Sequence, residues 1–250
     1  MSIEKFTPNW MTEEHEMVYD SALKMFQSWE PKDEQWRKNG MIDRDAWEEA
    51  GEMGFLCAAI PSEYGGGGGD FGHEAALIYA QTEANQSGFG GMVHSGIVAP
   101  YILAHGTEAQ KQAWLPKMAT GEYIGAIAMT EPGTGSDLQN IKTYAVKDGD
   151  DYIINGSKTF ITNGQHANLI LLACKTDREK GAQGVSLIIV ETDNVEGFER
   201  GRNLDKIGLT SQDTSELFFS NVRVPQTNLL GTVEGMGFIQ MMQELPRERL

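Results

Sequence analysis

Hydrophobic positions recur at helical spacing through residues 1–120. The apolar face of a first helix, over residues 12–30, consists of Val18, Ala22, Met25 and Trp29. Thr12 can cap this helix, and Pro31 is expected to end it, because proline lacks the N–H that a helix interior needs. Three more helices are predicted, near 43–54, over 72–84 and from a capping box at Thr107-Glu108-Ala109-Gln110. Residues 1–120 are therefore predicted to form an all-α bundle.

From residue 121 the pattern changes to short runs rich in β-branched and aromatic residues. Turn signals such as Asp148-Gly149 and Asn155-Gly156 separate these runs. The predicted strands are Tyr123–Thr130, Tyr152–Ile154, Leu169–Cys174, Val185–Val190 and Glu216–Val224. They predict an antiparallel β-sheet or barrel domain over residues 121–232, and hence an α+β protein.

Helical spacing returns from Gly235, with an apolar stripe of Phe238, Met241, Met242 and Leu245. The chain ends at Leu250 inside this pattern, without the glycine cap or the following proline that commonly ends a helix. We therefore expect residues 233–250 to be the start of a C-terminal helical domain that is incomplete in this sequence.

Composition narrows the possible partners. The 20 Lys and Arg residues against 36 Asp and Glu residues give a formal net charge of −16, which argues against nucleic acid and against an anionic membrane surface. Cys57 and Cys174 lie far apart in apolar surroundings, without the spacing of a disulfide framework or a metal site. No apolar run is long enough to span a bilayer, and residues 1–5 do not begin a secretory leader. The expectation is a cytoplasmic protein.

Two motifs carry the candidate chemistry. Residues 129–137 read Met-Thr-Glu-Pro-Gly-Thr-Gly-Ser-Asp, a strand that breaks into a turn of proline, glycine and hydroxyl residues. Such a turn exposes N–H groups and hydroxyls at one point, which suits a phosphate or a planar polar ring. Residues 158–164 read Lys-Thr-Phe-Ile-Thr-Asn-Gly, with Phe160 and Thr162 expected on one face of a strand. Either motif alone is also compatible with an ordinary turn or strand end.

In this order and spacing, the two motifs resemble the flavin-binding signature of the acyl-CoA dehydrogenase family. The resemblance continues through the predicted β domain, in residues 152–158, 208–214 and 221–225. Residues 93–95 and 244–250, the latter reading Glu-Leu-Pro-Arg-Glu-Arg-Leu, are similar to the long-chain branch of the family. The resemblance implies FAD as the cofactor and a fatty acyl-CoA thioester as the substrate.

In that family a carboxylate removes the proton beside the thioester carbonyl, and the flavin accepts hydride from the next carbon, which gives the trans-2-enoyl-CoA. The resemblance implies that the flavin is held by Ile127, Ala128, Met129, Thr130, Gly135, Ser136, Phe160, Ile161 and Thr162. It implies substrate contacts from Ser136, Pro246, Arg247 and Arg249. Phe160 stands where many relatives carry Trp, so a smaller ring is expected to pack against the flavin.

Glu248 is the expected catalytic base, because the long-chain and isovaleryl branches take their base from the matching position. Glu244 lies one turn earlier on the same helix face and is the rival. Judged from the residues alone, both are also compatible with solvated helix carboxylates that pair with Arg247 or Arg249. Pro246 either kinks this helix or lies in the first turn of a helix that begins at Leu245.

The resemblance further implies electron-transfer flavoprotein as the electron acceptor, a homotetramer at full length and a role in fatty acid β-oxidation. Two other functions remain open. One is an acyl-CoA oxidase or flavin monooxygenase of the same fold. The other is a non-catalytic fragment whose sheet domain binds a nucleotide or a partner. His94, in an apolar helix, is assigned no role.

Overall fold

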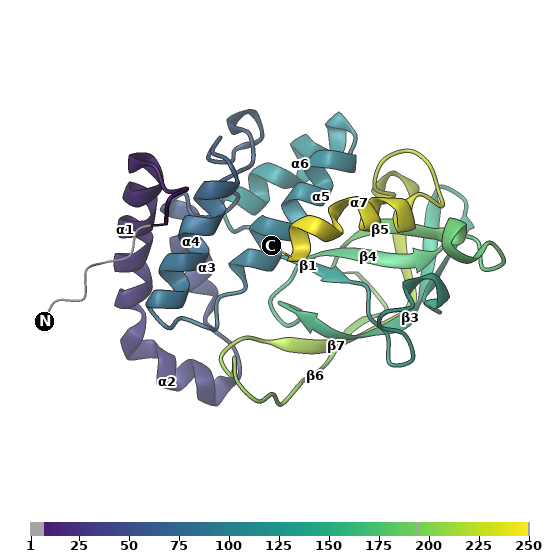
Figure 1. The fold of residues 1–250 in the computed structure, drawn as a ribbon. Helices are drawn as coiled ribbons and strands as arrows, with labels where there is room; N and C mark the ends of the chain where they lie inside the picture. The colour runs from purple at the N-terminus through teal and green to yellow at the C-terminus, as the bar shows by residue number, and fades with distance from the viewer. Residues whose placement is uncertain (1–7, 194, 250) are drawn as a thin grey trace, which may run out of the picture.

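The computed structural model describes residues 8–193 and 195–249; the first residues, on which the expectation about a leader depends, lie outside the described part. A layer of helices is followed by a curled sheet, and a last helix lies across that sheet (Figure 1). The helices are α1 (Glu13–Ser28), α2 (Glu30–Asn39), α3 (Arg44–Glu52), α4 (Phe71–Glu83), α5 (Ala99–His105), α6 (Glu108–Ala119) and α7 (Gly237–Arg249). The strands are β1 (Gly125–Ala128), β2 (Tyr144–Asp148), β3 (Asp151–Thr162), β4 (Leu169–Lys175), β5 (Val185–Glu191), β6 (Phe198–Asn203) and β7 (Thr214–Pro225).

Local capping signals set three of the helix starts. The side chains of Thr12, Asp70 and Thr107 accept backbone N–H groups in the first turns of α1, α4 and α6, and each belongs to a capping box. Pro31 was expected to end the first helix; α1 ends at Ser28, and Pro31 lies in the first turn of a second helix, α2. At that place a helix has no partner for the N–H that proline lacks, so the sequence analysis missed α2.

The segment before α5 is a π-helix, η2 (Met92–Val98), that continues directly into α5. π-Helices are rare in proteins, and those that occur often lie at functional sites. Pro100, in the first turn of α5, has no N–H to offer the carbonyl of Gly96 four residues earlier. The carbonyl of Gly96 accepts a side-chain hydrogen bond from α7.

The sheet is mixed, so the expectation of a purely antiparallel sheet was wrong. The strands follow the order β1-β4-β2-β3-β7-β6, and β5 pairs with β4. Strand β1 runs parallel to β4, from Gly125 opposite Leu169 to Ala128 opposite Leu172. The reason is the loop over residues 129–143, which carries the chain across the sheet, whereas a hairpin would turn it back antiparallel.

Two strands, β2 and β6, were not predicted, because most of their residues are polar or exposed. Strand β3 is longer than predicted and pairs with β7 along its length. The register between them shifts from Lys158 to Ile161, and within this bulge Phe160 has a φ of 60°. The bulge turns the Phe160 side chain out of the sheet core.

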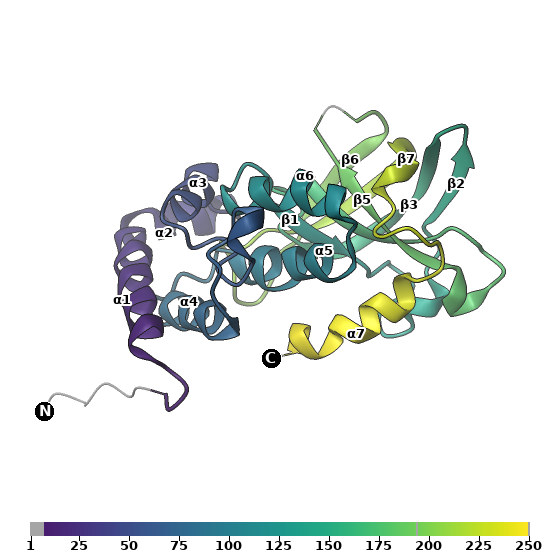
Figure 2. The same cartoon turned by 90° about the horizontal axis from the view of Figure 1, so that it is seen from above.

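Helix α7 packs against β5 and η2, and Figures 1 and 2 show it running along the sheet toward the helical layer. Met241 is buried in a hydrophobic cluster shared by α5, α6, β4 and β5, whereas Met242 of the predicted stripe is exposed. Pro246 lies inside α7, so the alternative of a helix that begins at Leu245 is wrong. Among the described residues, no helix has the length and apolar character needed to cross a membrane.

Candidate functional site

Two carboxylates of α7 face α5, and each meets a partner there. The Tyr101 hydroxyl donates to Oε1 of Glu248 at 2.6 Å, and His105 Nε2 lies 3.1 Å from Oε1 of Glu244. Both pairs have four-residue spacing, so the two antiparallel helices meet in two matched contacts. Burial, and after it the Glu248 carboxylate, raises the pKa of Tyr101, which therefore stays protonated as the donor. The sequence analysis named Glu248 but missed Tyr101.

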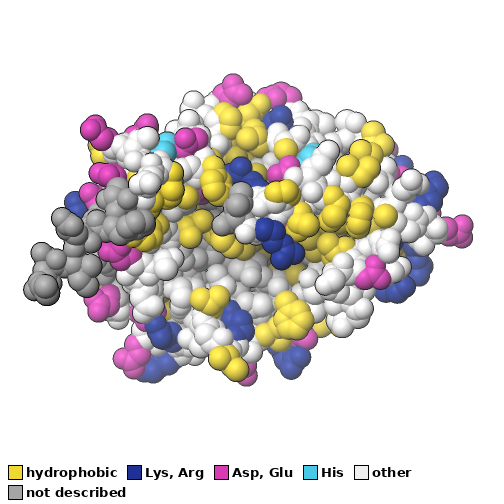
Figure 3. Space-filling model, in the orientation of Figure 1, with side chains coloured by type: hydrophobic (Ala, Val, Ile, Leu, Met, Phe, Trp, Pro, Cys, Tyr) yellow, Lys and Arg dark blue, Asp and Glu magenta, His cyan; other side chains and the backbone are white. Residues whose placement is uncertain are grey.

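Only one of the two carboxylates lines a cavity. The cavity has a volume of about 420 Å³, and Glu248 is among its lining residues whereas Glu244 is not. Its other walls come from the segment before α1, from α4 and η2, and from the end of α7. They consist of Pro8, Trp10, Phe71, Glu74, Ala75, Ile78, Tyr79, Thr82, Met92, Gly96, Ile97 and Arg247. Most of these side chains are apolar, so the cavity suits an apolar ligand. On the face drawn in Figure 3 the molecule is hollowed near its middle, with hydrophobic side chains along the hollow.

The predicted substrate contacts around Glu248 are Pro246, Arg247 and Arg249, and only Arg247 faces the cavity. Arg247 Nε donates to the open carbonyl of Gly96 at 3.0 Å, and its guanidinium lies 5.5 Å from the centre of the Phe71 ring. This contact joins the end of α7 to η2. Pro246 and Arg249 are exposed on the outer side of α7. Of the three, Arg247 alone is among the residues that line the cavity.

A buried ion pair holds the loop that follows β1. Lys158 Nζ donates to Oε1 of Glu131 and to the carbonyl of Met129, both at 2.9 Å. Glu131 also accepts the N–H groups of Lys142 at 2.6 Å and Thr143 at 2.9 Å. Burial opposes ionisation, but the Lys158 ammonium and these N–H groups hold the pKa of Glu131 below its ordinary value. The sequence analysis gave neither member of the pair a role.

Within this loop the turn itself is closed by reciprocal backbone hydrogen bonds between Glu131 and Thr134, at 2.9 and 3.0 Å. Gly135 and Ser136 follow on the surface. Among the described residues, neither of their N–H groups has a hydrogen-bond partner. The loop therefore presents two N–H groups and the Ser136 hydroxyl to the outside, as a phosphate site requires.

The remaining residues that were predicted to bind the flavin lie near this loop and differ in how deeply they are buried. Ala128 and Ile161 are buried in the sheet core, so only their backbones are open to a ligand. Ile127 and Met129 pack against the cluster that also holds Tyr101 and Met241, which joins the end of β1 to α5 and α7. Thr130 and Thr162 are half-buried. The Thr130 carbonyl accepts the N–H of Thr159 at 3.0 Å, so the loop start is tied to β3.

Phe160 offers an exposed aromatic ring on which a planar ligand could pack. Its ring is 67% exposed, although the neighbouring residues on both sides are buried. Exposing a large aromatic ring next to a loop with open N–H groups leaves apolar area in water that a flat ligand would cover. The chain therefore offers a flavin an aromatic face, hydroxyls and free N–H groups, and these residues fit FAD.

His94 is a structural clamp. Its Nδ1 accepts the N–H of Gly125 at 2.9 Å, and its Nε2 donates to the carbonyl of Met118 at 3.0 Å. Burial lowers the pKa of His94 to about 4, so the ring is neutral and ties η2 to α6 and β1. Cys57 Sγ lies 3.9 Å from the same ring and, like Cys174, is a buried free thiol.

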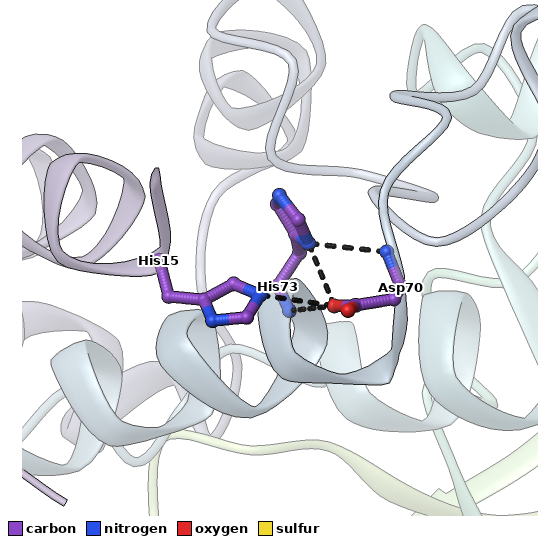
Figure 4. A group of neighbouring side chains, drawn as sticks. All are labelled: His15, Asp70 and His73. Carbon is purple, nitrogen blue, oxygen red and sulfur yellow. Dashed lines mark hydrogen bonds and ion pairs between the residues drawn. The ribbon is translucent and has the colours of Figure 1, made fainter. Parts of the chain in front are cut away.

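A second cluster, of His15, Asp70 and His73, lies where α1 meets α4 (Figure 4). His15 Nε2 and His73 Nδ1 lie 3.0 and 2.9 Å from Oδ1 of Asp70. Two imidazoles and a carboxylate also suit a divalent metal. However, Nδ1 of His15 accepts the N–H of Thr12, and Nδ1 of His73 accepts that of Asp70, in the two capping boxes. We therefore assign the cluster to helix capping.

The comparisons with known proteins agree with this geometry. The model of the acyl-CoA dehydrogenase N-terminal domain matches residues 12–122, and that of the acyl-CoA dehydrogenase middle domain matches residues 126–222. The mitochondrial long-chain specific acyl-CoA dehydrogenase of Sus scrofa is 48% identical over 241 residues, which cover 95% of this chain and 55% of that protein. The chain spans about half the length of the curated relatives it matches.

Solved structures are similar over nearly the whole chain. An acyl-CoA dehydrogenase from Geobacillus kaustophilus has a TM-score of 0.93 at 50% identity, and the match covers 97% of this chain and 64% of that one. An acyl-CoA dehydrogenase from Bacillus anthracis, complexed with FAD, has a TM-score of 0.89 at 33% identity, with 98% and 41% covered. The family resemblance inferred from the motifs is confirmed, as is the order of helical layer and sheet.

Proposed function

The chain belongs to the acyl-CoA dehydrogenase family, and we propose that the full-length protein oxidises a fatty acyl-CoA to the trans-2-enoyl-CoA with FAD as cofactor. The observation that carries this proposal is the position of Glu248, which lines an apolar cavity and is held by the Tyr101 hydroxyl at 2.6 Å. A carboxylate fixed beside space for an acyl chain is what removal of a proton next to a thioester requires.

Glu248 is the proposed base. Its Oε1 is engaged by Tyr101, and Oε2 is left to accept the proton from the carbon beside the thioester carbonyl. Apolar walls flank this half-buried carboxylate, and Tyr101 fixes its orientation. Arg247, tied to η2 through Gly96, closes the same end of the cavity. Pro246 and Arg249 are also proposed substrate contacts; they lie on the exposed side of α7, outside the lining of the cavity.

The flavin is proposed to lie against the end of β1 and the bulge of β3. Phe160 would pack against the ring system, and the hydroxyls or backbone of Thr130 and Thr162 would bond its polar edge. Gly135 and Ser136 would hold phosphate, with Ser136 also near the thioester arm. When bound, FAD supplies the acceptor for the hydride that leaves the next carbon of the substrate.

The proposal also covers the domain organisation, the electron acceptor, the oligomeric state and the cellular compartment. Residues 1–120, 121–232 and 233–250 are assigned to the helical domain, the flavin-binding domain and the start of a second helical domain. Electrons are proposed to pass to electron-transfer flavoprotein, in fatty acid β-oxidation, from a homotetramer. The two buried free thiols support a reducing compartment, the cytoplasm.

Anaerobic titration of the full-length flavoprotein with acyl-CoA thioesters of several chain lengths tests the proposal. Long-chain thioesters are expected to bleach the flavin of the wild type. Glu248→Gln should keep its flavin and lose nearly all bleaching, because an amide cannot accept the proton. Glu244→Gln is the matched control, one turn away, and should bleach normally.

If Glu248→Gln bleaches within a few-fold of the wild-type rate, the base lies elsewhere. If the wild type binds flavin but no thioester bleaches it, the dehydrogenase proposal is wrong. Peroxide formation under air without a response to electron-transfer flavoprotein would point to an oxidase or a monooxygenase. A full-length protein that binds no flavin would point to a non-catalytic role.

A further inference from the structure

A second pocket adjoins the cavity that Glu248 lines. It has a volume of about 260 Å³ and lies between the end of α4 with the segment after it, the start of η2 and the connection from β6 to β7. The wall common to the two spaces consists of Ile78, Thr82 and Met92. The Met92 side chain is unbranched and 47% exposed, so it can change its rotamer. An acyl chain that fills the first cavity can therefore extend past Met92 into the second pocket.

This second pocket is rich in side-chain amides, and we call it the amide pocket. The amides that line it are those of Gln81, Asn85, Gln86 and Gln212. Among the described residues that line it, none is charged. Two charged residues beside the lining residues are engaged elsewhere. The Glu83 carboxylate accepts the Tyr19 hydroxyl at 2.5 Å. Lys206 Nζ donates to the backbone carbonyl of Gln212 and, at 2.8 Å, to Oγ1 of Thr214. The amide pocket therefore suits a neutral polar group better than an ion.

The Gln86 side chain is buried, with 4% of it exposed, and its amide has no hydrogen-bond partner among the described residues. The segment that carries it is held in place, because Gln81 Nε2 donates to the backbone carbonyls of Gln86 and Phe89, both at 2.8 Å. Gln212 is half-buried, and its amide likewise has no partner in the part of the chain that the structure describes. Burying an amide without a partner costs free energy, and a ligand that hydrogen-bonds to it offsets this cost.

We propose that the amide pocket binds a hydroxyl group in the distal half of the acyl chain, so that the preferred substrates are hydroxylated fatty acyl-CoA thioesters. The inference rests on the proposed function, which places the reacting carbons beside Glu248 and the far end of the chain in the amide pocket. A hydroxyl group both donates and accepts, and each amide offers an acceptor oxygen and two N–H donors, so Gln86 and Gln212 match it. The apolar side chains of Ile78 and Phe89 line the same pocket and suit the methylene groups on either side of the hydroxyl.

The test compares three fatty acyl-CoA thioesters of equal chain length on the full-length flavoprotein: one unsubstituted, one with a mid-chain hydroxyl and one with a terminal hydroxyl. The wild type should have a higher kcat/KM for a hydroxylated thioester than for the unsubstituted one. Gln86→Leu and Gln212→Leu should each lower this ratio about fivefold, the effect of one neutral hydrogen bond. Gln112→Leu, at an exposed position on α6 outside the pocket, is the matched control and should keep the wild-type ratio.

Two further measurements do not depend on turnover. In anaerobic calorimetric titrations, Glu248→Gln should bind the preferred hydroxylated thioester about fivefold more tightly than the double variant Glu248→Gln/Gln86→Leu. In urea unfolding, Gln86→Leu should be at least as stable as the wild type, because an apolar group of similar shape replaces an amide without a partner.

A wild type that prefers the unsubstituted chain would overturn the substrate class. A lower stability of Gln86→Leu with equal losses on all three thioesters would make Gln86 a structural residue and overturn the pocket assignment. Normal bleaching with an unchanged ratio in Gln86→Leu would overturn the pocket alone. Failure of every thioester to bleach the flavin, with tighter binding of the hydroxylated chain still dependent on Gln86, would reject the dehydrogenase reaction and retain the pocket.

Discussion

The Tyr101 hydroxyl donates a 2.6 Å hydrogen bond to Oε1 of Glu248, across 147 positions of the sequence. Tyr101 lies on α5 just after the π-helix, and Glu248 lies in the last turn of α7. One turn along, His105 and Glu244 repeat the contact. These two pairs fix the rotation of α7 about its axis, and this rotation decides which carboxylate meets the cavity.

Tyr101→Phe removes the donor and keeps the packing of the ring. A hydrogen bond to a charged group contributes about 1.5–3 kcal/mol, and a tenfold change in rate corresponds to about 1.4 kcal/mol. Since Tyr101 holds the proposed base in its orientation, the loss of this bond should lower kcat about tenfold or more, with the flavin content unchanged. His105→Phe, the control, should keep kcat within a few-fold of the wild type. An unchanged kcat in Tyr101→Phe would reduce Tyr101 to a packing role.

The buried pair of Lys158 and Glu131 should be costly to break from one side. Lys158→Met leaves the Glu131 carboxylate buried without its cation, which should lower the free energy of unfolding by about 3–5 kcal/mol. Adding Glu131→Gln should recover part of this loss, because no unpaired charge remains. The exposed pair of Arg202 and Glu216 is the control, and Arg202→Met should lower the free energy of unfolding far less than Lys158→Met, because water screens the exposed charges. Urea unfolding of each variant measures these differences, and equal costs for the two pairs would contradict the argument.

Helix positions and caps were the most predictable part of the fold, because their signals lie within a few residues of one another. The capping box at Thr107 and Gln110 forms as its sequence indicated. The sheet was less predictable: the parallel pairing of β1 with β4 depends on where a loop of about 15 residues leads the chain, which no local pattern records. Strands β2 and β6 lacked the buried alternation that reveals a strand.

The candidate site also contains residues that local sequence patterns indicate and residues whose role depends on tertiary packing. Glu248 and the loop motif were predicted as site residues from short patterns that resemble a family, and their roles stay predictions. Tyr101 was not, because its role arises only when α5 and α7 pack together. The ring of Phe160 was expected on a strand face, and the structure adds the bulge with positive φ that turns it outward. Such a conformation in a non-glycine residue depends on tertiary context.

Phe160→Ala should weaken flavin binding without weakening the fold. The ring is largely exposed, so its removal exposes little new apolar surface in the flavin-free protein. If the ring packs against the flavin, about 1 kcal/mol of contact is lost and the dissociation constant rises about fivefold. Fluorescence titration of the flavin-free full-length protein measures this. Phe218→Ala, at a partly exposed position on β7, is the control, and equal flavin binding in all three proteins would remove Phe160 from the site.

The shared carboxylate of the two helix caps should make stability depend on acid pH. The His73 side chain, and next the His15 side chain, lie against the Asp70 carboxylate and lower its pKa from 3.8 to about 2. A carboxyl group with a lowered pKa in the folded state stabilises that state fully above its unfolded pKa, and this contribution disappears as the pH falls from about 4 to about 2. Asp70→Asn keeps an oxygen that can accept the N–H groups of Gly72 and His73 but removes the charge. The variant should therefore be less stable than the wild type above pH 4, and the gap in urea midpoint should narrow steadily below it. A gap that stays constant from pH 6 to pH 3 would mean that the charge of Asp70 contributes nothing and that shape alone joins α1 to α4.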